Sequence, residues 1–274
     1  GQGHGEIHFL DLHTSSAEGV PFICVGDTLR NRRFARDFPT PVILGLEEQI
    51  DGALLEYMNN LGCVTFGFEA GQHRSEKSVQ REEAALMLAL VFAGCLRKRD
   101  VPDFDALYKR LEAERGSTPR VIEVLKRHVV RQGDGFKMEP GFSNFDRITK
   151  GQLLARDNGG EIRSPMTARI LLPLYQGQGD DGFFVCRPVL RFWLAVSRAI
   201  RHMRVDRVAH LMPGVRKHPG RDDTLVVDTR TARLFPLQAF HLLGFRKLRA
   251  QGNVLLVTRR RFDDPRLDRL RRDG

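Results

Sequence analysis

A histidine and a glutamate each stand where a short apolar segment ends. His13 closes IHFLDLH (residues 7–13), and Glu69 directly follows VTFGF (residues 64–68). Both segments predict short buried strands, because their apolar residues run almost continuously. Ligands gather at the carboxyl ends of strands in open α/β sheets, so an imidazole and a carboxylate there could bind a ligand and move protons. Taken singly, His13 could simply be a hydrogen-bonded histidine, and Glu69 could simply be a solvated glutamate at a strand end.

Neighbouring segments supply the elements that would position these two residues. Residues 20–25 (VPFICV) and 41–44 (PVIL) predict two more strands. Residues 47–61 carry apolar side chains at helical spacing and predict a helix. Ser78 could cap a long apolar helix that runs to about Gly94. Strands that alternate with helices predict an α/β layer architecture.

The pattern changes along the rest of the chain and predicts four parts. Residues 1–96 form the α/β part. Residues 97–131 are charged and predict a linker with one or two surface helices, one of them over PRVIEVLKRH (residues 119–128). Residues 132–190 are rich in Gly, with short apolar runs every eight to twelve residues, and predict a small all-β domain. Residues 191–274 predict a mixed α/β basic extension.

The extension contains a predicted helix at residues 192–203 (FWLAVSRAIRHM) and a predicted strand hairpin at residues 224–235 (TLVVDTRTARLF). It also carries the positive charge. The whole chain has a net charge of +10, and residues 191–274 hold 20 Lys and Arg against 8 Asp and Glu. The charge therefore says little about the surroundings of His13.

Composition excludes several classes of protein. The 274 residues are 41% hydrophobic and 28% charged, which is typical of a globular protein. No stretch approaches the roughly 18 apolar residues of a membrane span, so no membrane partner is expected. The four cysteines have no CxxC spacing, which predicts neither a zinc ribbon nor a disulfide framework. A reducing cytoplasm is the simpler location.

Two motifs, DLHTSS (residues 11–16) and GFEAGQH (residues 67–73), resemble the succinylglutamate desuccinylase/aspartoacylase family, relatives of the zinc carboxypeptidases. The resemblance continues through PLYQGQGDDGFF (residues 173–184) to about residue 190. It implies part of a zinc-carboxypeptidase-like mixed sheet with flanking helices, followed by the small β domain. It also implies a zinc ion as cofactor and a small N-acyl amino acid-like substrate whose amide or ester bond is hydrolysed.

The resemblance assigns roles to particular residues. His13 would be a zinc ligand, and Glu69 the general base that takes a proton from zinc-bound water and later gives it to the leaving amine. Asp11 lies two residues before His13 on the same strand face and could fix the imidazole tautomer, although it could equally just end the strand. Candidates for substrate contact are Thr14, Tyr57, which is more often a core-edge residue at such spacing, and Gln178 in the loop of residues 176–181.

The chain departs from the family pattern upstream of His13. The family's other two zinc ligands, in a His-x-x-Glu motif, and an Asn-Arg pair that binds substrate both precede the DLH strand. Here His4-Gly5-Glu6 has one residue too few between ligands and is interpreted as a linker. The Asn31-Arg32 pair follows His13 and is interpreted as part of a basic loop beside the pocket mouth.

We therefore expect the chain to be the C-terminal portion of a zinc amidohydrolase, with one zinc ligand where three are needed. On this expectation residues 1–274 alone bind zinc weakly and are inactive. A second departure is Phe183-Phe184, which stands where the aspartoacylase branch has tyrosines. It argues against an acidic N-acyl-aspartate substrate.

Two other function classes remain open: a non-catalytic family member, and a binding module that uses the basic tail. Residues 213–221 and 258–274 could contact phosphate groups or an acidic partner. However, aromatic residues do not interleave with the basic ones, and acidic residues interrupt the run, so a nucleic acid partner is not expected. The remaining candidates show no ligand spacing and are interpreted as surface or packed histidines: His73, His128, His202, His210, His218 and His241.

Overall fold

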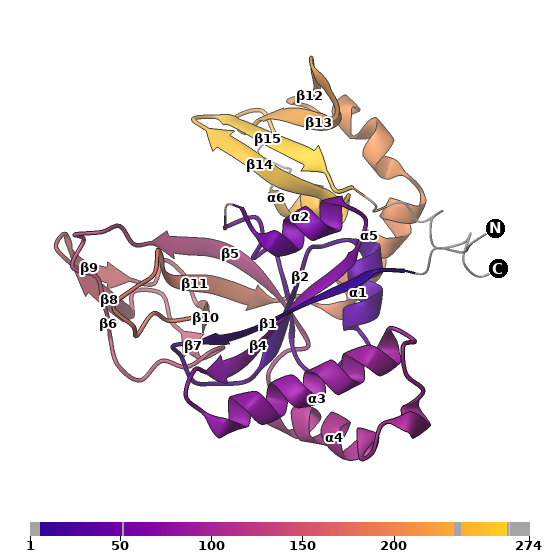
Figure 1. Cartoon of the computed structure of the whole chain (residues 1–274). Helices are drawn as coiled ribbons and strands as arrows, with labels where there is room; N and C mark the ends of the chain where they lie inside the picture. The colour runs from indigo at the N-terminus through magenta and orange to yellow at the C-terminus, as the bar shows by residue number, and fades with distance from the viewer. Residues whose placement is uncertain (1–5, 51, 233–236, 262, 264–274) are drawn as a thin grey trace, which may run out of the picture.

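The computed structural model describes residues 6–50, 52–232, 237–261 and 263 of the chain. An eight-stranded mixed sheet forms its centre, with the strand order β1-β4-β2-β3-β5-β11-β10-β7 (Figure 1). Its strands are β1 (His8–Ser15), β2 (Phe22–Val25), β3 (Val42–Leu44), β4 (Val64–Gln72), β5 (Val121–Val129), β7 (Arg147–Ile148), β10 (Ala168–Leu171) and β11 (Asp181–Pro188).

Helices and two smaller sheets surround this sheet. The helices are α1 (Leu29–Ala35), α2 (Leu54–Asn60), α3 (Glu76–Phe92), α4 (Phe104–Arg115), α5 (Arg191–His202) and α6 (Leu237–Leu242), with 3-10 turns η1 (Lys98–Asp100) and η2 (Val205–Leu211). A three-stranded sheet contains β6 (Lys137–Met138), β8 (Leu153–Asp157) and β9 (Gly160–Arg163). A four-stranded antiparallel sheet contains β12 (Val215–His218), β13 (Arg221–Asp228), β15 (Val254–Arg259) and β14 (Phe245–Gln251). No described helix is long and apolar enough to cross a membrane.

Strand direction reverses once within the first half of the large sheet. β1 and β4 are parallel, β4 and β2 are antiparallel, and β2, β3 and β5 are parallel to one another. The carboxyl ends of β1 and β4 therefore lie at one end of the sheet. Those of β2 and β3 lie at the opposite end.

Each face of the large sheet has its own apolar core. On one face Phe66 and Phe68 of β4 pack with Leu88 of α3 and with residues of α1 and α4. On the other face Phe22 of β2 packs with Phe184 of β11 and with neighbouring apolar residues. Figure 1 shows α2 and α3 on opposite sides of the sheet. Burial of each such side chain contributes roughly 1.5–3 kcal/mol, so both faces are fixed by packing.

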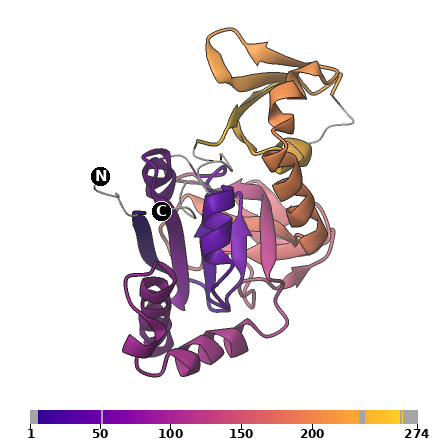
Figure 2. The same cartoon turned by 90° about the vertical axis from the view of Figure 1, so that its right-hand side faces the viewer.

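The C-terminal unit consists of α5, η2, α6 and the four-stranded sheet, and it has a separate core that includes Phe240, Phe245 and Val257. Figure 2 shows α5 beside α1 on the same face of the large sheet. Leu194 of α5 packs against the core on that face. The unit is thus joined to the large sheet by apolar contact as well as by charge.

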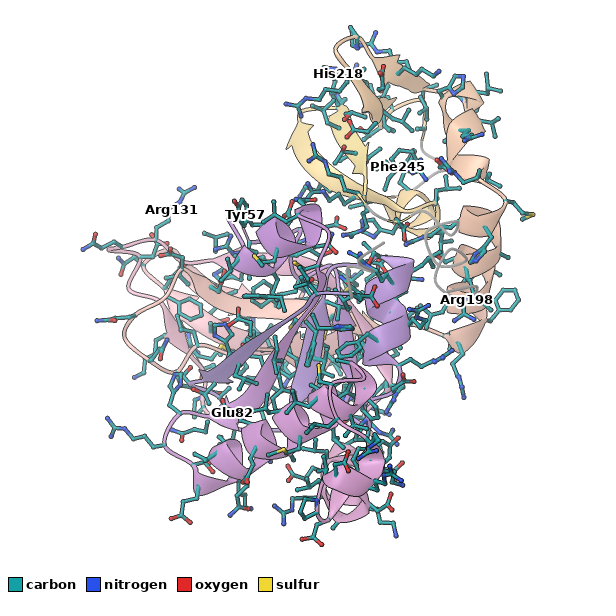
Figure 3. All side chains as sticks on the ribbon, turned by 45° about the vertical axis from the view of Figure 1, so that its right-hand side comes forward. Tyr57, Glu82, Arg131, Arg198, His218 and Phe245 are labelled. Atoms are coloured by element: carbon teal, nitrogen blue, oxygen red, sulfur yellow. The ribbon has the colours of Figure 1, made fainter. Side chains whose placement is uncertain are left out.

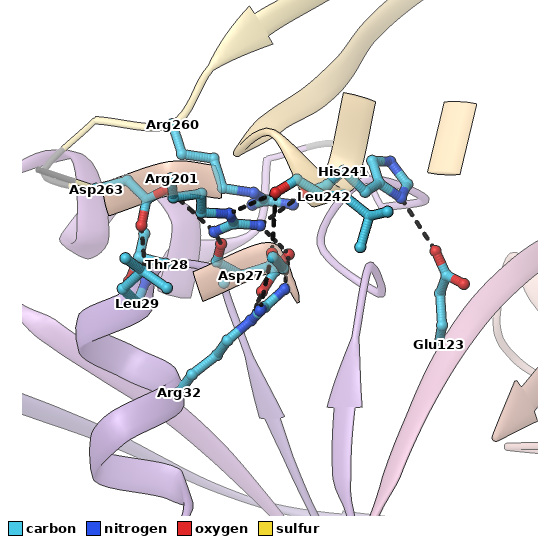
Figure 4. Close-up of polar contacts among 12 residues, drawn as sticks. Asp27, Thr28, Leu29, Arg32, Glu123, Arg201, His241, Leu242, Arg260 and Asp263 are labelled. Atoms are coloured by element: carbon cyan, nitrogen blue, oxygen red, sulfur yellow. Dashed lines mark hydrogen bonds and ion pairs between the residues drawn. The ribbon is translucent and has the colours of Figure 1, made fainter. Parts of the chain in front are cut away.

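A buried group of charges lies where the C-terminal unit meets the large sheet (Figure 4). Asp27, just after β2, accepts hydrogen bonds from Arg32 of α1 at 2.7 Å and from Arg201 of α5 at 2.9 Å. Arg201 also donates to Asp263 at 3.0 Å, and its side chain is only 2% exposed. Burial alone would raise the pKa of Asp27, but Arg32 and Arg201 hold it well below its usual range. We call these four residues, together with Glu47, Glu48, Glu123, His241 and Arg260, the charged cluster.

His241 is the titratable bridge within the charged cluster. Its two ring nitrogens lie 3.0 Å from Glu48 and 3.1 Å from Glu123. Burial disfavours the imidazolium, yet these two carboxylates raise the pKa of His241 to about 9, against a smaller repulsion from Arg260. The histidine interpreted from sequence as surface or packed therefore carries a charge at neutral pH and connects α6 to β5.

The mixed α/β fold predicted from the sequence is confirmed, with differences in several elements. Residues 119–128 do not form a helix: β5 pairs with β3 and β11 there, because Ile122 and Val124 face one core in strand alternation. The helix predicted for residues 47–61 begins only at Leu54, since Gly52 has a left-handed backbone (φ +74°).

Other differences concern caps, loops and domain limits. Ser78 does not cap α3, which begins at Glu76; its hydroxyl donates to the Gln72 carbonyl instead. Asn31 and Arg32 lie in helix α1, capped by Thr28, rather than in a basic loop. The hairpin predicted for residues 224–235 is replaced by the pairing of β13 with β12 on one side and β15 on the other. Residues 233–236 of that segment lie outside the described chain.

Within residues 132–190, the expected β structure is present, but only β6, β8 and β9 form a sheet of their own. β7, β10 and β11 complete the large sheet. The segment 97–131 likewise contributes β5 to that sheet, so it is more than a helical linker. The hydrogen-bonded pairing of β5 with both β3 and β11 therefore joins parts that the sequence separates.

The charge on His241 predicts a loss of stability in alkaline solution. The stabilisation from imidazolium is fully present below the unfolded-state pKa of about 6.5 and is lost as pH rises through about 9. His241→Gln should lower the free energy of unfolding by several kcal/mol at pH 7, and the difference from wild type should shrink by pH 10. Urea unfolding at both pH values measures this. The exposed His202→Gln serves as control, and equal pH dependence in all three proteins would contradict the assignment.

Candidate active site

His13 and Glu69 lie side by side at one end of the large sheet. They are register partners in the parallel pair of β1 and β4, and adjacent strands lie about 4.8 Å apart. Glu69 is also the register partner of Phe22 on β2. Paired residues point to the same face, so both side chains lie on the Phe22 face. Each strand continues two or three residues past the predicted site residue, to Ser15 and Gln72.

The alternation of β4 forces Glu69 onto this face. Phe66, Phe68 and Ala70 are at most 1% exposed and fill the core beneath α3. Because successive strand residues point to opposite faces, Glu69 must point away from that core. It reaches the edge of the second core, next to Phe22, which is fully buried. The carboxyl group is thus held in an apolar setting by the packing of its neighbours.

Gly71 fixes the backbone just beyond Glu69. Its φ of +111° is a left-handed conformation that side chains with a Cβ rarely adopt. A Cβ at this position would also lie 2.6 Å from Nη1 of Arg81. That nitrogen donates a hydrogen bond of 2.8 Å to the carbonyl of Ala70. The glycine of the EAG sequence therefore allows Arg81 to bind the end of β4.

The Glu69 carboxyl group is poised to exchange a proton near neutral pH. Its Oε2 atom is buried and has no hydrogen-bond partner among the described residues. Burial raises the pKa of Glu69 to about 7; His13 opposes this shift, and Asp11 and Glu82 add to it. A buried oxygen without a partner is costly, and such groups occur where a ligand or a reaction uses them.

His13 is held by Asp11. Its Nε2 atom lies 2.8 Å from Oδ1 of Asp11, and the two side chains are 54% and 26% exposed. This contact agrees with the predicted pairing and leaves Nδ1 as the second ring nitrogen. Glu82 of α3, which the sequence did not indicate, also interacts with His13: burial raises the pKa of Glu82, and the imidazole partly offsets it.

A second histidine ties the rim of the site together. The hydroxyl of Thr14 lies 2.8 Å from Nδ1 of His73, whose Nε2 lies 3.2 Å from Oε1 of Gln176. The backbone N–H of Tyr175 donates to the Ser16 hydroxyl at 3.2 Å. The loop after β10 is therefore tied to the ends of β1 and β4. The sequence singled out this loop and the GQH tripeptide, but not the contact of His73 with Gln176.

No described hydrogen bond or ion pair places two of the predicted substrate-contact residues, Gln178 and Tyr57, next to His13 or Glu69. Gln178 is exposed and has no described hydrogen bond. The Tyr57 side chain is 62% exposed, and no described residue binds its hydroxyl. Figure 3 shows Tyr57 across the large sheet from Glu82 of α3, so α2 lies on the face of Glu69, but Tyr57 itself is exposed. Helical spacing alone could not reveal that the Tyr57 side chain points outward.

The described residues do not by themselves fit a catalytic zinc ion. Such an ion normally has three protein ligands, and no group of three or more His, Cys, Asp and Glu side chains in the described chain is arranged to hold a metal. His13 offers one imidazole, and its Nε2 atom already contacts Asp11. Of these groups, the Glu69 carboxyl, whose pKa is raised to about 7, is able to exchange a proton near neutral pH.

No protein-family model matches the chain, and no curated protein does so. Its structure is similar to that of a succinylglutamate desuccinylase/aspartoacylase from Rhodobacter sphaeroides, with 16% sequence identity, a TM-score of 0.49, and 66% of this chain and 58% of that one covered. It is also similar to an ectoine utilization protein from Ruegeria pomeroyi (19% identity, TM-score 0.45, 66% and 60% covered).

A third similar structure is succinylglutamate desuccinylase from Vibrio cholerae, with 16% identity, a TM-score of 0.43, and 66% of this chain and 53% of that chain covered. The chain thus spans 53–60% of the length of these three proteins. About 66% of the chain is thus similar in structure to members of the succinylglutamate desuccinylase/aspartoacylase family. This is the family that the DLHTSS and GFEAGQH motifs resemble.

Proposed function

We propose that the protein is a hydrolase that cleaves an amide or ester bond of a small N-acyl amino acid-like substrate. The observation that carries the proposal is the position of Glu69: a buried carboxyl group with one unpartnered oxygen, beside His13 at the end of two parallel strands. The substrate class is taken from the motif resemblance. Buried thiols at Cys24, Cys63 and Cys186, and an exposed one at Cys95, all unpaired, support a reducing cytoplasmic location.

In the proposed reaction Glu69 acts as general base and then as general acid. Its carboxylate takes a proton from a water molecule as the water oxygen forms a bond to the substrate carbonyl carbon. The carbon–nitrogen bond then breaks, and Glu69 delivers the proton to the leaving amine. A carboxyl group with a pKa of about 7 can do both near neutral pH. The products are a carboxylic acid and an amine.

His13 and Asp11 would orient the reacting group beside Glu69. The contact between Nε2 and Asp11 holds the imidazole and fixes its tautomer, which leaves Nδ1 for a substrate oxygen or a metal ion. The zinc ion predicted from the resemblance would activate water and polarise the carbonyl. It would need two protein ligands besides His13, which the described residues do not supply.

Substitutions test the two roles separately in the full-length gene product. Glu69→Gln should lower kcat for hydrolysis of N-acyl amino acids by about 10²-fold or more, because it keeps the shape and removes the proton acceptor. His13→Ala should lower both activity and zinc content. Zinc content and turnover are measured together on each purified variant. Glu83→Gln, an exposed carboxylate on α3, is the matched control.

A fully active Glu69→Gln protein would overturn the mechanism. Absence of hydrolysis by the full-length wild type across a panel of N-acyl amino acids and esters, with zinc supplied, would favour the non-catalytic alternative. Residues 1–274 alone should bind zinc weakly, because the described residues supply one ligand at the right place. Tight zinc binding by this chain would contradict that ligand count.

Glu69 also predicts a pH effect on stability that needs no substrate. An acid whose folded pKa is raised loses stability as pH climbs from its unfolded pKa, about 4.3, through its folded pKa, about 7. Glu69→Gln should therefore raise the free energy of unfolding at pH 8 by about 2 kcal/mol and leave it nearly unchanged at pH 4.5. Urea titrations at both pH values measure the difference. A variant less stable than wild type at pH 8 would contradict the raised pKa of the buried Glu69 carboxyl group.

A further inference from the structure

A large cavity lies between the C-terminal unit and the large sheet, away from the candidate active site. Its volume is about 600 Å³, within the range of small-molecule sites. It is lined by Asp27 and Gly45, just after β2 and β3, and by residues of α5 and α6. Leu44 and its register partner Glu123 also line it. Leu44 belongs to the core beneath α1, α3 and α4.

This position separates the cavity from His13 and Glu69 in two ways. Those residues lie on the Phe22 face of the sheet, whereas Leu44 faces the opposite core. They also lie near the carboxyl ends of β1 and β4, whereas Asp27 follows the end of the oppositely directed β2. The cavity is therefore on the other face and at the other end of the sheet.

One wall of the cavity is apolar and partly open. Leu190 and Trp193, at the start of α5, are 66% and 46% exposed, and Leu194 continues the wall. Trp193 packs edge-on against Phe192, with ring centroids 5.3 Å apart. Exposed aromatic and aliphatic side chains beside a cavity of this size favour a ligand with an apolar body.

The floor is charged but balanced by its own ion pairs. Asp27 binds Arg32, Glu48 and Glu123 bind His241, and Arg260 binds Glu47 and Glu48. A ligand on this floor need not supply a compensating charge. One donor is unused: the Nε atom of Arg260 is buried and has no partner among the described residues.

A smaller cavity of about 110 Å³ adjoins the large one and shares Arg32, Leu44 and Leu194 with it. Its lining contains no carboxylate. Besides five apolar residues, it consists of arginines alone: Arg32, Arg36, Arg120 and Arg198. Arg32 is paired with Asp27, and the other three arginines give this small space a positive potential, which attracts an anion.

Three of these arginines are not neutralised within the cavity. Arg120 donates to the backbone carbonyls of Arg36 and Phe38 rather than to a carboxylate. Burial lowers the pKa of Arg120; Tyr108 and Glu112 partly oppose this shift, and Arg115 and Arg191 add to it. The nearest carboxylate of Arg36 is the exposed Asp37, at 3.9 Å. Arg198 is exposed and has no ion pair among the described residues.

We propose that the two cavities together bind a small amphiphilic organic anion. Its carboxylate or phosphate head would lie among Arg36, Arg120 and Arg198, and its apolar body against Leu194 and Trp193. Planar guanidinium groups bind a carboxylate and a phosphate in the same way, through paired N–H donors. The site requires neither His13 nor Glu69, so it does not depend on the proposed hydrolase activity.

Trp193 provides the measurement, because it is the only tryptophan of the chain. Octanoate, as a probe with an anionic head and an apolar body, should change Trp193 fluorescence saturably, and calorimetry should give the same Kd. Octyl phosphate should bind likewise, and its affinity relative to octanoate distinguishes the two head groups. Octanol and inorganic phosphate, each with half of the chemistry, should bind at least about tenfold more weakly. Equal binding of octanol or of phosphate would overturn the proposal.

Variants locate the head group. Arg198→Gln should weaken octanoate binding by about tenfold, as expected for loss of one charge-assisted hydrogen bond. Arg216→Gln on β12 removes the same charge from an exposed site in the same unit and should not change the Kd. Glu69→Gln should also bind normally, which separates this site from the catalytic one. An unchanged Kd in Arg198→Gln, or an equal loss in Arg216→Gln, would overturn the assignment.

Discussion

The antiparallel pairing of β4 with β2 determines where chemistry is possible in this protein. In an all-parallel sheet, every carboxyl end would lie along one edge. Here the antiparallel pairing of β4 with β2 sends the ends of β1 and β4 to one side and the ends of β2 and β3 to the other. Polar residues near the ends of these strands therefore lie in two separate places, with His13 and Glu69 at one and Asp27 at the other.

The charged cluster around Asp27 joins the C-terminal unit to the sheet by buried ion pairs rather than by apolar packing. Removing one partner of a buried ion pair costs about 3–5 kcal/mol, whereas the pair itself can be nearly neutral relative to apolar packing. Loss of Arg201 or Asp27 alone would therefore leave a buried charge without its partner, which would disfavour the docked arrangement. The smaller cavity beside them has no carboxylate in its lining, so its arginines dominate the potential there.

Local patterns revealed much of the fold and the core of the candidate site. His13 and Glu69 could be found because apolar runs define the strands and because their motifs resemble a family. Asp11 followed from two-residue spacing on one strand. His241, Arg201 and Arg260 could not be found, since their carboxylate partners lie far away in sequence and carry no local signal. β5 was mistaken for a helix because its charged residues mask the alternation of Ile122 and Val124.

The position of Glu69 shows how a buried carboxyl oxygen without a hydrogen-bond partner is tolerated in this fold. The alternation that buries Phe66 and Phe68 is strongly favourable, and it leaves Glu69 no other direction in which to point. The cost of an unpartnered carboxyl oxygen is therefore offset by packing that Glu69 does not itself provide. A polar residue at 66 or 68 would destroy that packing, whereas residue 69 can change with little effect on the sheet. Packing on the opposite face of β4 therefore fixes the direction of the Glu69 side chain.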